Sequence, residues 1–76
     1  MTHYDELQYR FDGVSFVVFM DVLGDLAKYN PEKNTTTYLK GLLDLDSSDF
    51  DQYESDVVQY IEKVIIPRKN NIDITH

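Results

Sequence analysis

The segment LQYRFDGVSFVVF contains two alternating apolar runs on either side of Asp12 and Gly13. Asp-Gly favours a two-residue type I′ turn, because both central residues of that turn need a positive φ. The expected cross-strand pairs are Phe11 with Val14, Tyr9 with Phe16, and Leu7 with Val18. Because strand side chains alternate, these six side chains share one face of the predicted β-hairpin. An isolated hairpin is barely stable in water, so other segments must cover it.

Residues 34–45, NTTTYLKGLLDL, can supply either a third strand or a short helix. The threonines and Tyr38 suit a pleated sheet, and Gly41 would then mark a bulge or a bend. Tyr38, Leu42 and Leu45 also fit helical spacing. The sequence leaves both alternatives open for this segment.

Residues 20–31 favour a short helix. Val22, Leu26 and Tyr29 recur at spacings of four and three, as on one face of a helix. Pro31 disfavours helical backbone in the residue before it, so the helix is predicted to end there.

The strongest helical pattern runs from Ser48 to Ile65. Ser48 is a good N-cap residue, and Asp51 follows three residues later, as in a capping box. Pro67 is expected to end the helix. The predicted apolar stripe has spacings of 3, 4, 4 and 3 and consists of Phe50, Tyr53, Val57, Ile61 and Val64.

These elements predict an α+β fold with an N-terminal β-hairpin, a third strand, one short helix and a C-terminal amphipathic helix. The chain of 76 residues has room for one small core, so residues 1–76 are expected to form a single acidic domain. Residues 70–76 are predicted to be a loose tail. The longest apolar run, Phe16–Met20, is too short to span a bilayer, and MTHYDE lacks the regions of a signal peptide. We therefore expect a soluble cytoplasmic protein.

The charge balance restricts the partners that such a chain can bind. Fourteen acidic and seven basic side chains give a formal charge of −7. This charge disfavours direct binding to nucleic acid or to anionic membranes, and it favours encounter with basic proteins. Net charge also keeps many proteins soluble without any further role.

The acids are concentrated in one segment. Between Lys40 and Lys63 the chain has no Lys or Arg. The candidate partner-binding residues are the acids of this segment, namely Asp44, Asp46, Asp49, Asp51, Glu54, Asp56 and Glu62. A calcium loop starting at Asp44 fails, because Asp49 stands where a Gly is required and Ser55 where a bidentate acid is required. We expect no metal site.

The residues needed for catalysis are missing from the sequence. The two histidines, His3 and His76, lie at opposite ends of the chain, and there is no Cys nucleophile or Gly-rich phosphate loop. Paired carboxylates need a cleft that shifts their pKa, for which a core of this size has little room. We expect a protein that is not an enzyme and that binds no cofactor.

The predicted helix presents part of the acidic segment as a ridge. At ~100° per residue, Asp49, Asp51, Asp56 and Glu62 lie opposite the apolar stripe, whereas Glu54 falls within the apolar arc. Asp49 and Asp56 would stand about 10.5 Å apart along the helix axis, close to three phosphate intervals of ~3.4 Å on one DNA strand. Asp44 and Asp46 would extend this line. Acids near a helix N-terminus are also favoured by the helix dipole alone. An ordinary solvated helix, however, mixes charges of both signs.

In its size, its charge, its lack of Cys and its acidic segment 44–62, the chain resembles small acidic phage proteins that mimic DNA. This class includes inhibitors of the nucleoid protein HU, inhibitors of uracil-DNA glycosylase, and anti-restriction and anti-CRISPR proteins. The resemblance implies a host-takeover inhibitor that occupies the DNA site of a basic host protein, such as HU or a DNA-processing enzyme, in the bacterial cytoplasm. The resemblance includes no diagnostic motif, so it assigns no functional residue of the class to a position in this sequence.

A second hypothesis belongs to a different class. The chain could be a small non-catalytic interaction or assembly module whose apolar surface joins it to itself, as a homodimer, or to another subunit. The residues considered for that surface are Val17, Phe19 and Tyr60. An apolar patch larger than several hundred Å² would support this hypothesis.

Overall fold

The computed structural model of the chain describes residues 3–68, so the predicted loose tail at 70–76 lies outside the described residues. In this part of the chain the fold is α+β, as the sequence predicts. The elements follow in the order η1 (His3–Glu6, a 3₁₀ turn), β1 (Gln8–Phe11), β2 (Phe16–Met20), β3 (Gly24–Asn30), β4 (Thr35–Tyr38), α1 (Lys40–Leu43), α2 (Ser47–Tyr60) and η2 (Ile61–Ile65, a π-helical segment).

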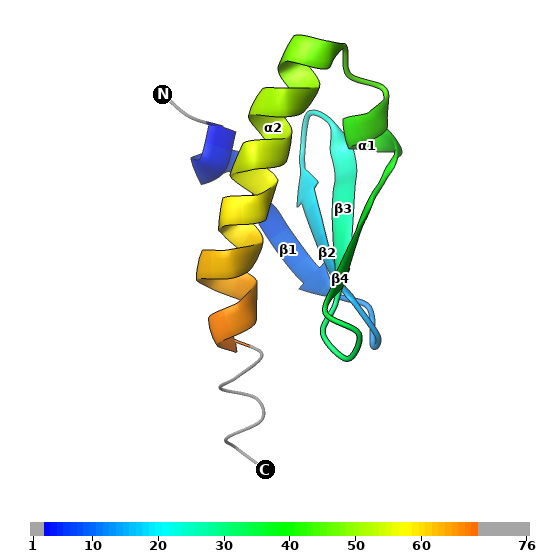
Figure 1. Cartoon of the computed structure of the whole chain (residues 1–76), viewed down its shortest axis with the longest axis vertical. Coiled ribbons are helices and arrows are strands. Elements are labelled where there is room, and N and C mark those ends of the chain that lie inside the picture. Colours follow the sequence, from blue (N-terminus) through cyan, green and yellow to red (C-terminus); the bar gives the residue numbers. More distant parts are fainter. Residues whose placement is uncertain (1–2, 69–76) are drawn as a thin grey trace.

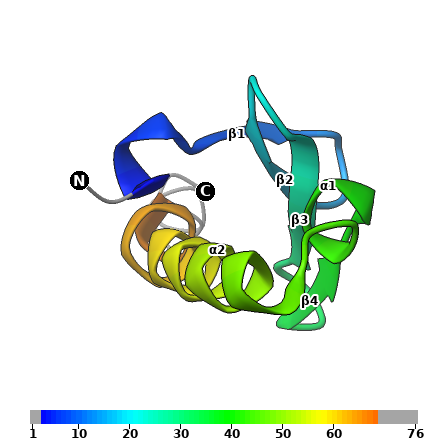
Figure 2. The ribbon, with the colours of Figure 1, turned by 90° about the horizontal axis from the view of Figure 1, so that it is seen from above.

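The four strands form one antiparallel sheet in the order β1-β2-β3-β4. The long helix α2, continued by η2, lies along one face of this sheet, and η1 lies beside α2 (Figures 1 and 2). The core fills the space between the sheet and the helix. Its most completely buried large side chains are Val18, Leu26, Leu42, Val57 and Ile65.

The predicted β1–β2 hairpin is present, but its register differs by two residues. Phe11 pairs with Phe16, and residues 12–15 form the connection. Asp12 explains the difference, because its Oδ1 accepts hydrogen bonds from the backbone N–H groups of Val14 (2.8 Å) and Ser15 (2.7 Å). Only Gly13 has a positive φ in this turn, at 102°, so the type I′ geometry does not form. A shift of two residues preserves the faces. Phe16 and Val18 of the predicted face are buried, whereas Phe11 and Val14 are exposed.

The short helix predicted for residues 20–31 is wrong, because residues 24–30 form β3. A β-bulge between β2 and β3 accounts for the misleading spacing. Bulges interrupt the alternation of side chains, and here both Leu26 and Ala27 are fully buried. The bulge thus brings Leu26 and Tyr29, three residues apart, into the same core, and this spacing imitates a helix.

Residues 34–45 contain both of the structures that the sequence left open. β4 ends at Tyr38, and α1 begins two residues later at Lys40. Gly41 lies in α1 because that helix packs directly on the backbone of the β2–β3 connection and of β3. A Cβ at this position would lie 2.6 Å from the carbonyl oxygen of Leu23 and 2.5 Å from that of Asp25.

The long helix begins and ends differently from the prediction. Its N-cap is Asp46, whose carboxylate accepts a hydrogen bond from the backbone N–H of Asp49. Helical backbone also continues past Pro67 to Arg68. The π-helical turn adds a residue to the helix, with the N–H of Ile66 donating to the carbonyl of Ile61. Ile65, four residues after Ile61, is fully buried, and Val64 of the predicted stripe is partly buried against the core.

Candidate partner-binding surface

α1, the first turns of α2 and the β2–β3 connection lie toward one end of the molecule, and η1 lies beside the middle of α2 (Figure 1). Acidic residues are frequent in these segments. We call this region the acidic end. It is defined by seven exposed acids, namely Asp5, Glu6, Asp21, Asp44, Asp46, Asp49 and Asp51. Among the described residues, Lys40 in α1 is the basic residue that lies within the acidic end.

Asp46 and Asp49 are fixed by the start of α2. Besides capping the helix, Asp46 Oδ1 accepts a hydrogen bond of 3.4 Å from the Ser48 hydroxyl. Asp49 donates its backbone N–H to Asp46 at 3.2 Å. These bonds position the backbone of both acids, while their side chains stay exposed.

The acids of α2 form two rows, and the single ridge predicted from the sequence is therefore wrong. The outermost positions of α2 carry neutral residues, Ser48, Gln52, Ser55 and Gln59, which are all exposed at spacings of 4, 3 and 4. The carboxylates lie on the two flanks of this neutral strip. One flank faces η1, and the other faces β4.

The flank that faces η1 carries Asp49 and Asp56 around Tyr53. Burial raises the pKa of the Tyr53 hydroxyl, and the negative charges of Glu6, Asp49 and Asp56 raise it further. A negative field disfavours the tyrosinate form, so the direction of this shift indicates that acids of η1 and α2 converge here. The ring of Tyr4 in η1 packs edge-on against Tyr60 of α2, with ring centroids 5.7 Å apart, and this contact holds η1 in place.

Asp56 is not an exposed ridge residue as predicted. Its side chain is partly buried, and its Oδ2 is buried without a hydrogen-bond partner among the described residues. The position directly precedes the fully buried Val57. The sequence pattern placed Asp56 on the solvent side because the helical wheel takes no account of η1, which packs beside α2.

The flank that faces β4 carries Asp51, Glu54 and Glu62. Burial raises the pKa of the Tyr38 hydroxyl of β4, and its hydrogen bond to Glu54 raises it further. Glu54 is thus partly buried at the edge of the core. Glu62 is exposed and lines a recess of about 160 Å³ with Thr36 and Val58.

Sequence reasoning missed three members of the acidic end, Asp5, Glu6 and Asp21. All three line one recess of about 250 Å³ between η1 and the β2–β3 connection. The sequence gives little indication that these acids share a surface with residues 44–62, because they are dispersed and far from that segment. The packing of η1 against α2 places Asp5 and Glu6 here, whereas the β2–β3 connection places Asp21.

One basic side chain, Arg10, is held by an ion pair on the sheet. The guanidinium of Arg10 donates two hydrogen bonds to Asp25, at 2.9 and 3.0 Å. This pair raises the pKa of Arg10 and lowers that of Asp25. The same guanidinium lies over the ring of Phe19, 5.2 Å from its centroid.

The apolar surface considered for an assembly module is not exposed. Val17 is 6% exposed and Tyr60 is 8% exposed. Phe19 is partly buried, beneath Arg10. Among the described residues, the exposed large hydrophobic side chains are different ones, namely Phe11, Val14, Val22, Leu43 and Val58.

Within residues 3–68, no three acidic or histidine side chains form a group that could hold a metal ion. No helix in this range is long and apolar enough to cross a membrane. Comparisons with protein-family models, with curated proteins and with solved structures found no significant match to this chain. A functional proposal must therefore rest on the chemistry of the residues.

Proposed function

We propose that the chain inhibits a basic DNA-binding protein by occupying its DNA site with the acidic end. The observation that carries this proposal is the exposure of Asp44, Asp46, Asp49 and Asp51 on adjoining elements, with Lys40 as the base beside them. DNA sites are arrays of Lys and Arg arranged for phosphates. Fixed carboxylates can engage the same array without the cost of bending a duplex.

The two-row arrangement of acids on α2 supports the proposal better than a single ridge would. An α-helix with its side chains is about 10–12 Å wide, which lies within the range of the DNA grooves, ~6 Å for the minor and ~12 Å for the major groove. Asp49 lies on one flank and Asp51 on the other. They can therefore contact Lys and Arg side chains of the target that normally contact the two DNA strands bordering a groove. Carboxylates carry no base code, so competition with DNA of any sequence is expected.

The target that best fits this chemistry is a protein that binds DNA mainly through its backbone, such as the nucleoid protein HU. A DNA-processing enzyme is the other target within the same proposal. The encounter would take place in the cytoplasm of a bacterial host. The assembly-module hypothesis has less support, because Val17 and Tyr60 are buried within the domain itself.

A pair of charge-matched variants tests the proposal. Asp44→Asn with Asp51→Asn removes two charges from the acidic end, whereas Asp12→Asn with Glu32→Gln removes two charges from loops at the opposite end (Figure 1). Both variants change the net charge equally, so only the position of the charges differs. Asparagine at residue 12 keeps the oxygen that accepts hydrogen bonds in the turn.

Each variant is immobilised and used to capture proteins from a bacterial lysate, with and without excess duplex of arbitrary sequence. Wild type is expected to capture a DNA-binding protein that the duplex releases. The variant of the acidic end should lose it, and the control variant should retain it. Equal capture by the two variants would show that net charge alone is responsible, and capture that duplex never reduces would rule out a shared DNA site.

A further inference from the structure

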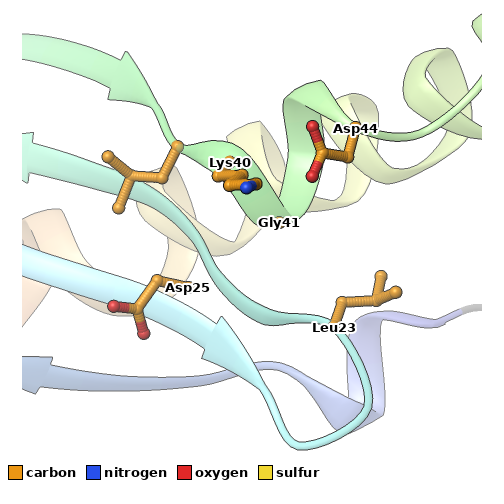
Figure 3. A pocket seen from close by; sticks show the side chains of 6 residues that line it. Leu23, Asp25, Lys40, Gly41 and Asp44 are labelled. Carbon is orange, nitrogen blue, oxygen red and sulfur yellow. The ribbon is translucent and has the colours of Figure 1, made fainter.

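The two edges of the sheet are covered differently. Where β4 ends, α1 lies beside the first residues of β3, and Figure 3 shows Gly41 of α1 near the segment of Leu23 and Asp25. In the same region the N–H of Leu39 donates to the carbonyl of Leu26 at 2.8 Å. At the opposite edge, β1 pairs with β2 alone in the described part of the chain. The outer side of β1 is therefore an unpaired strand edge.

The backbone groups of Tyr9 and Phe11 point to this open edge. In an antiparallel ladder, hydrogen-bonded pairs alternate with pairs that exchange no hydrogen bond. The N–H of Asp12 donates to the carbonyl of Ser15 at 3.0 Å, so Arg10 belongs to the next hydrogen-bonded pair with β2. Tyr9 and Phe11 lie in the alternate pairs, so their N–H and C=O groups are directed away from β2. Among the described residues, neither makes a backbone hydrogen bond to a turn or loop.

The side chains of β1 lack the features that usually keep an edge strand from pairing. Natural edges often carry Lys or Pro, or a bulge twists them away. β1 has the sequence QYRF, and the bulge of this sheet lies between β2 and β3. The charge of Arg10 is balanced by its ion pair with Asp25. Phe11 is 54% exposed although its ring lies against Phe16, so aromatic surface remains uncovered at this edge.

A second copy of the chain carries a complementary edge. In an antiparallel pair with Arg10 opposite Arg10 of the second copy, Tyr9 lies opposite Phe11 of that copy, and Phe11 opposite its Tyr9. Each of these two pairs would exchange both of its N–H···O bonds. We propose that two copies of the chain form a dimer through antiparallel pairing of their β1 strands, centred on Arg10. This dimer uses other residues than the apolar surface considered from the sequence, and it does not depend on the proposed function.

Neighbouring registers satisfy fewer backbone groups. A pair centred on Tyr9 would place Phe11 opposite Leu7, whose N–H already donates to the carbonyl of Tyr4 at 3.1 Å. A pair centred on Phe11 would place Tyr9 opposite Gly13, which lies outside β1. The register centred on Arg10 therefore uses the outward groups of both Tyr9 and Phe11.

The charges of the chain predict how this dimer responds to salt. The net charge of −7 on each copy opposes association, and salt screens that repulsion within a Debye length of ~10 Å at 0.1 M. Arg10 lies opposite its counterpart, but each guanidinium is paired with Asp25 of its own chain. Dimerisation should therefore become tighter as salt rises. An association of the acidic end with basic side chains of another copy would become weaker instead.

Sedimentation equilibrium of the purified chain measures the dissociation constant of the dimer. Phe11→Pro removes an N–H that points to the open edge and leaves the ladder with β2 in place. Thr36→Pro is the matched control, because the Leu39–Leu26 hydrogen bond places the N–H of Thr36 on the outer edge of β4 by the same alternation. Phe11→Lys and its control Val22→Lys make the same comparison without Pro. Thermal melts verify that each variant is folded.

A disulfide tests the register, because the chain has no Cys of its own. In the proposed pair, Arg10 and its counterpart face each other without exchanging hydrogen bonds, so their Cα atoms should lie about 4.5 Å apart. This distance is within the range that a disulfide spans. Arg10→Cys should therefore give a covalently linked dimer with oxidised glutathione. Gln8→Cys is the control, because residue 8 would lie four residues, or ~13 Å, from its counterpart.

The mass of wild type is expected to rise with concentration toward twice that of one chain, and more readily at high salt. Phe11→Pro should weaken dimerisation at least about tenfold, because the two-fold symmetry removes two hydrogen bonds with one substitution. Phe11→Lys should also weaken it, and both controls should dimerise like wild type. Arg10→Cys should cross-link, and Gln8→Cys should not.

Several results would overturn the inference. Wild type that stays monomeric up to ~1 mM, dimerisation that weakens as salt rises, or a folded Arg10→Cys variant that does not cross-link would each exclude the proposed pair. Growth beyond a dimer that Thr36→Pro also weakens would indicate pairing of β1 with β4 of the next copy instead. None of these measurements involves DNA or a basic partner, so their outcome is distinct from that of the proposed function.

Discussion

Replacing Gly41 with Ala should destabilise the fold although it improves the helical propensity of α1. The added Cβ would lie 2.5 Å from the Asp25 carbonyl oxygen and 2.6 Å from that of Leu23, well inside the 3.4 Å at which ordinary contact begins. Both neighbours are backbone atoms, so neither can rotate away. α1 must therefore move off β3, and it would carry the fully buried Leu42 with it.

The magnitude follows from two opposing effects. Overpacking of this kind typically costs ~1–3 kcal/mol, and Ala gains up to ~1 kcal/mol over Gly within a helix. A net loss of about 1–2 kcal/mol is expected, and each kcal/mol should lower the melting temperature by ~4–8 °C in a domain of this size.

Thermal and urea denaturation followed by circular dichroism measure this loss. Ser55→Ala is the matched control, because Ser55 is exposed on the outer face of α2 and its replacement should change stability by no more than ~0.5 kcal/mol. A Gly41→Ala protein that melts at or above the temperature of wild type would show that α1 does not press on β3.

Three further outcomes are expected. Ile65→Ala should lower the free energy of unfolding by ~2–5 kcal/mol in urea titrations, as core truncations do, and a loss near zero would contradict the full burial of Ile65. Asp46→Ala should cost ~0.5–2 kcal/mol because the N-cap is lost, whereas Ser48→Ala should have little effect; a larger loss at Ser48 in thermal melts would reverse the assignment. Burial raises the pKa of both Tyr53 and Tyr60, so the folded state holds these protons more tightly than the unfolded chain does. Stability is therefore fully present below the unfolded value of ~10 and is lost as the pH rises through the higher folded values; a urea midpoint that increases from pH 9 to pH 11 would contradict this.

Local patterns identified the elements whose contacts are close in sequence. The β1–β2 hairpin follows from alternating residues around Asp12 and Gly13, and α2 follows from its apolar stripe and its Pro-free interior. The exact turn was not predictable from the Asp-Gly pair alone, because the side chain of Asp12 competes for the N–H groups of Val14 and Ser15. The register was consequently wrong by two residues, although an even shift keeps the same side chains on the same face of the hairpin.

Features that depend on distant contacts were not predictable. The spacing of Leu26 and Tyr29 suggested a helix because a bulge and a helical turn can bring the same positions together, and only the pairing with β2 distinguishes them. The exposed acids at 44–51 were identified from the sequence. The contribution of Glu6 and the partial burial of Asp56 were not, because both depend on η1 packing against α2.

The central claim is that the acidic end takes the place of DNA on a basic protein. The most direct measurement titrates the chain into HU bound to a fluorescent duplex of arbitrary sequence and follows the anisotropy of the duplex. If the acidic end occupies the DNA site, the anisotropy should fall to that of free duplex. Asp44→Asn with Asp51→Asn should displace the duplex far less well than Asp12→Asn with Glu32→Gln. An anisotropy that stays constant at saturating concentrations, or that rises because the chain and the duplex bind HU together, would contradict the account.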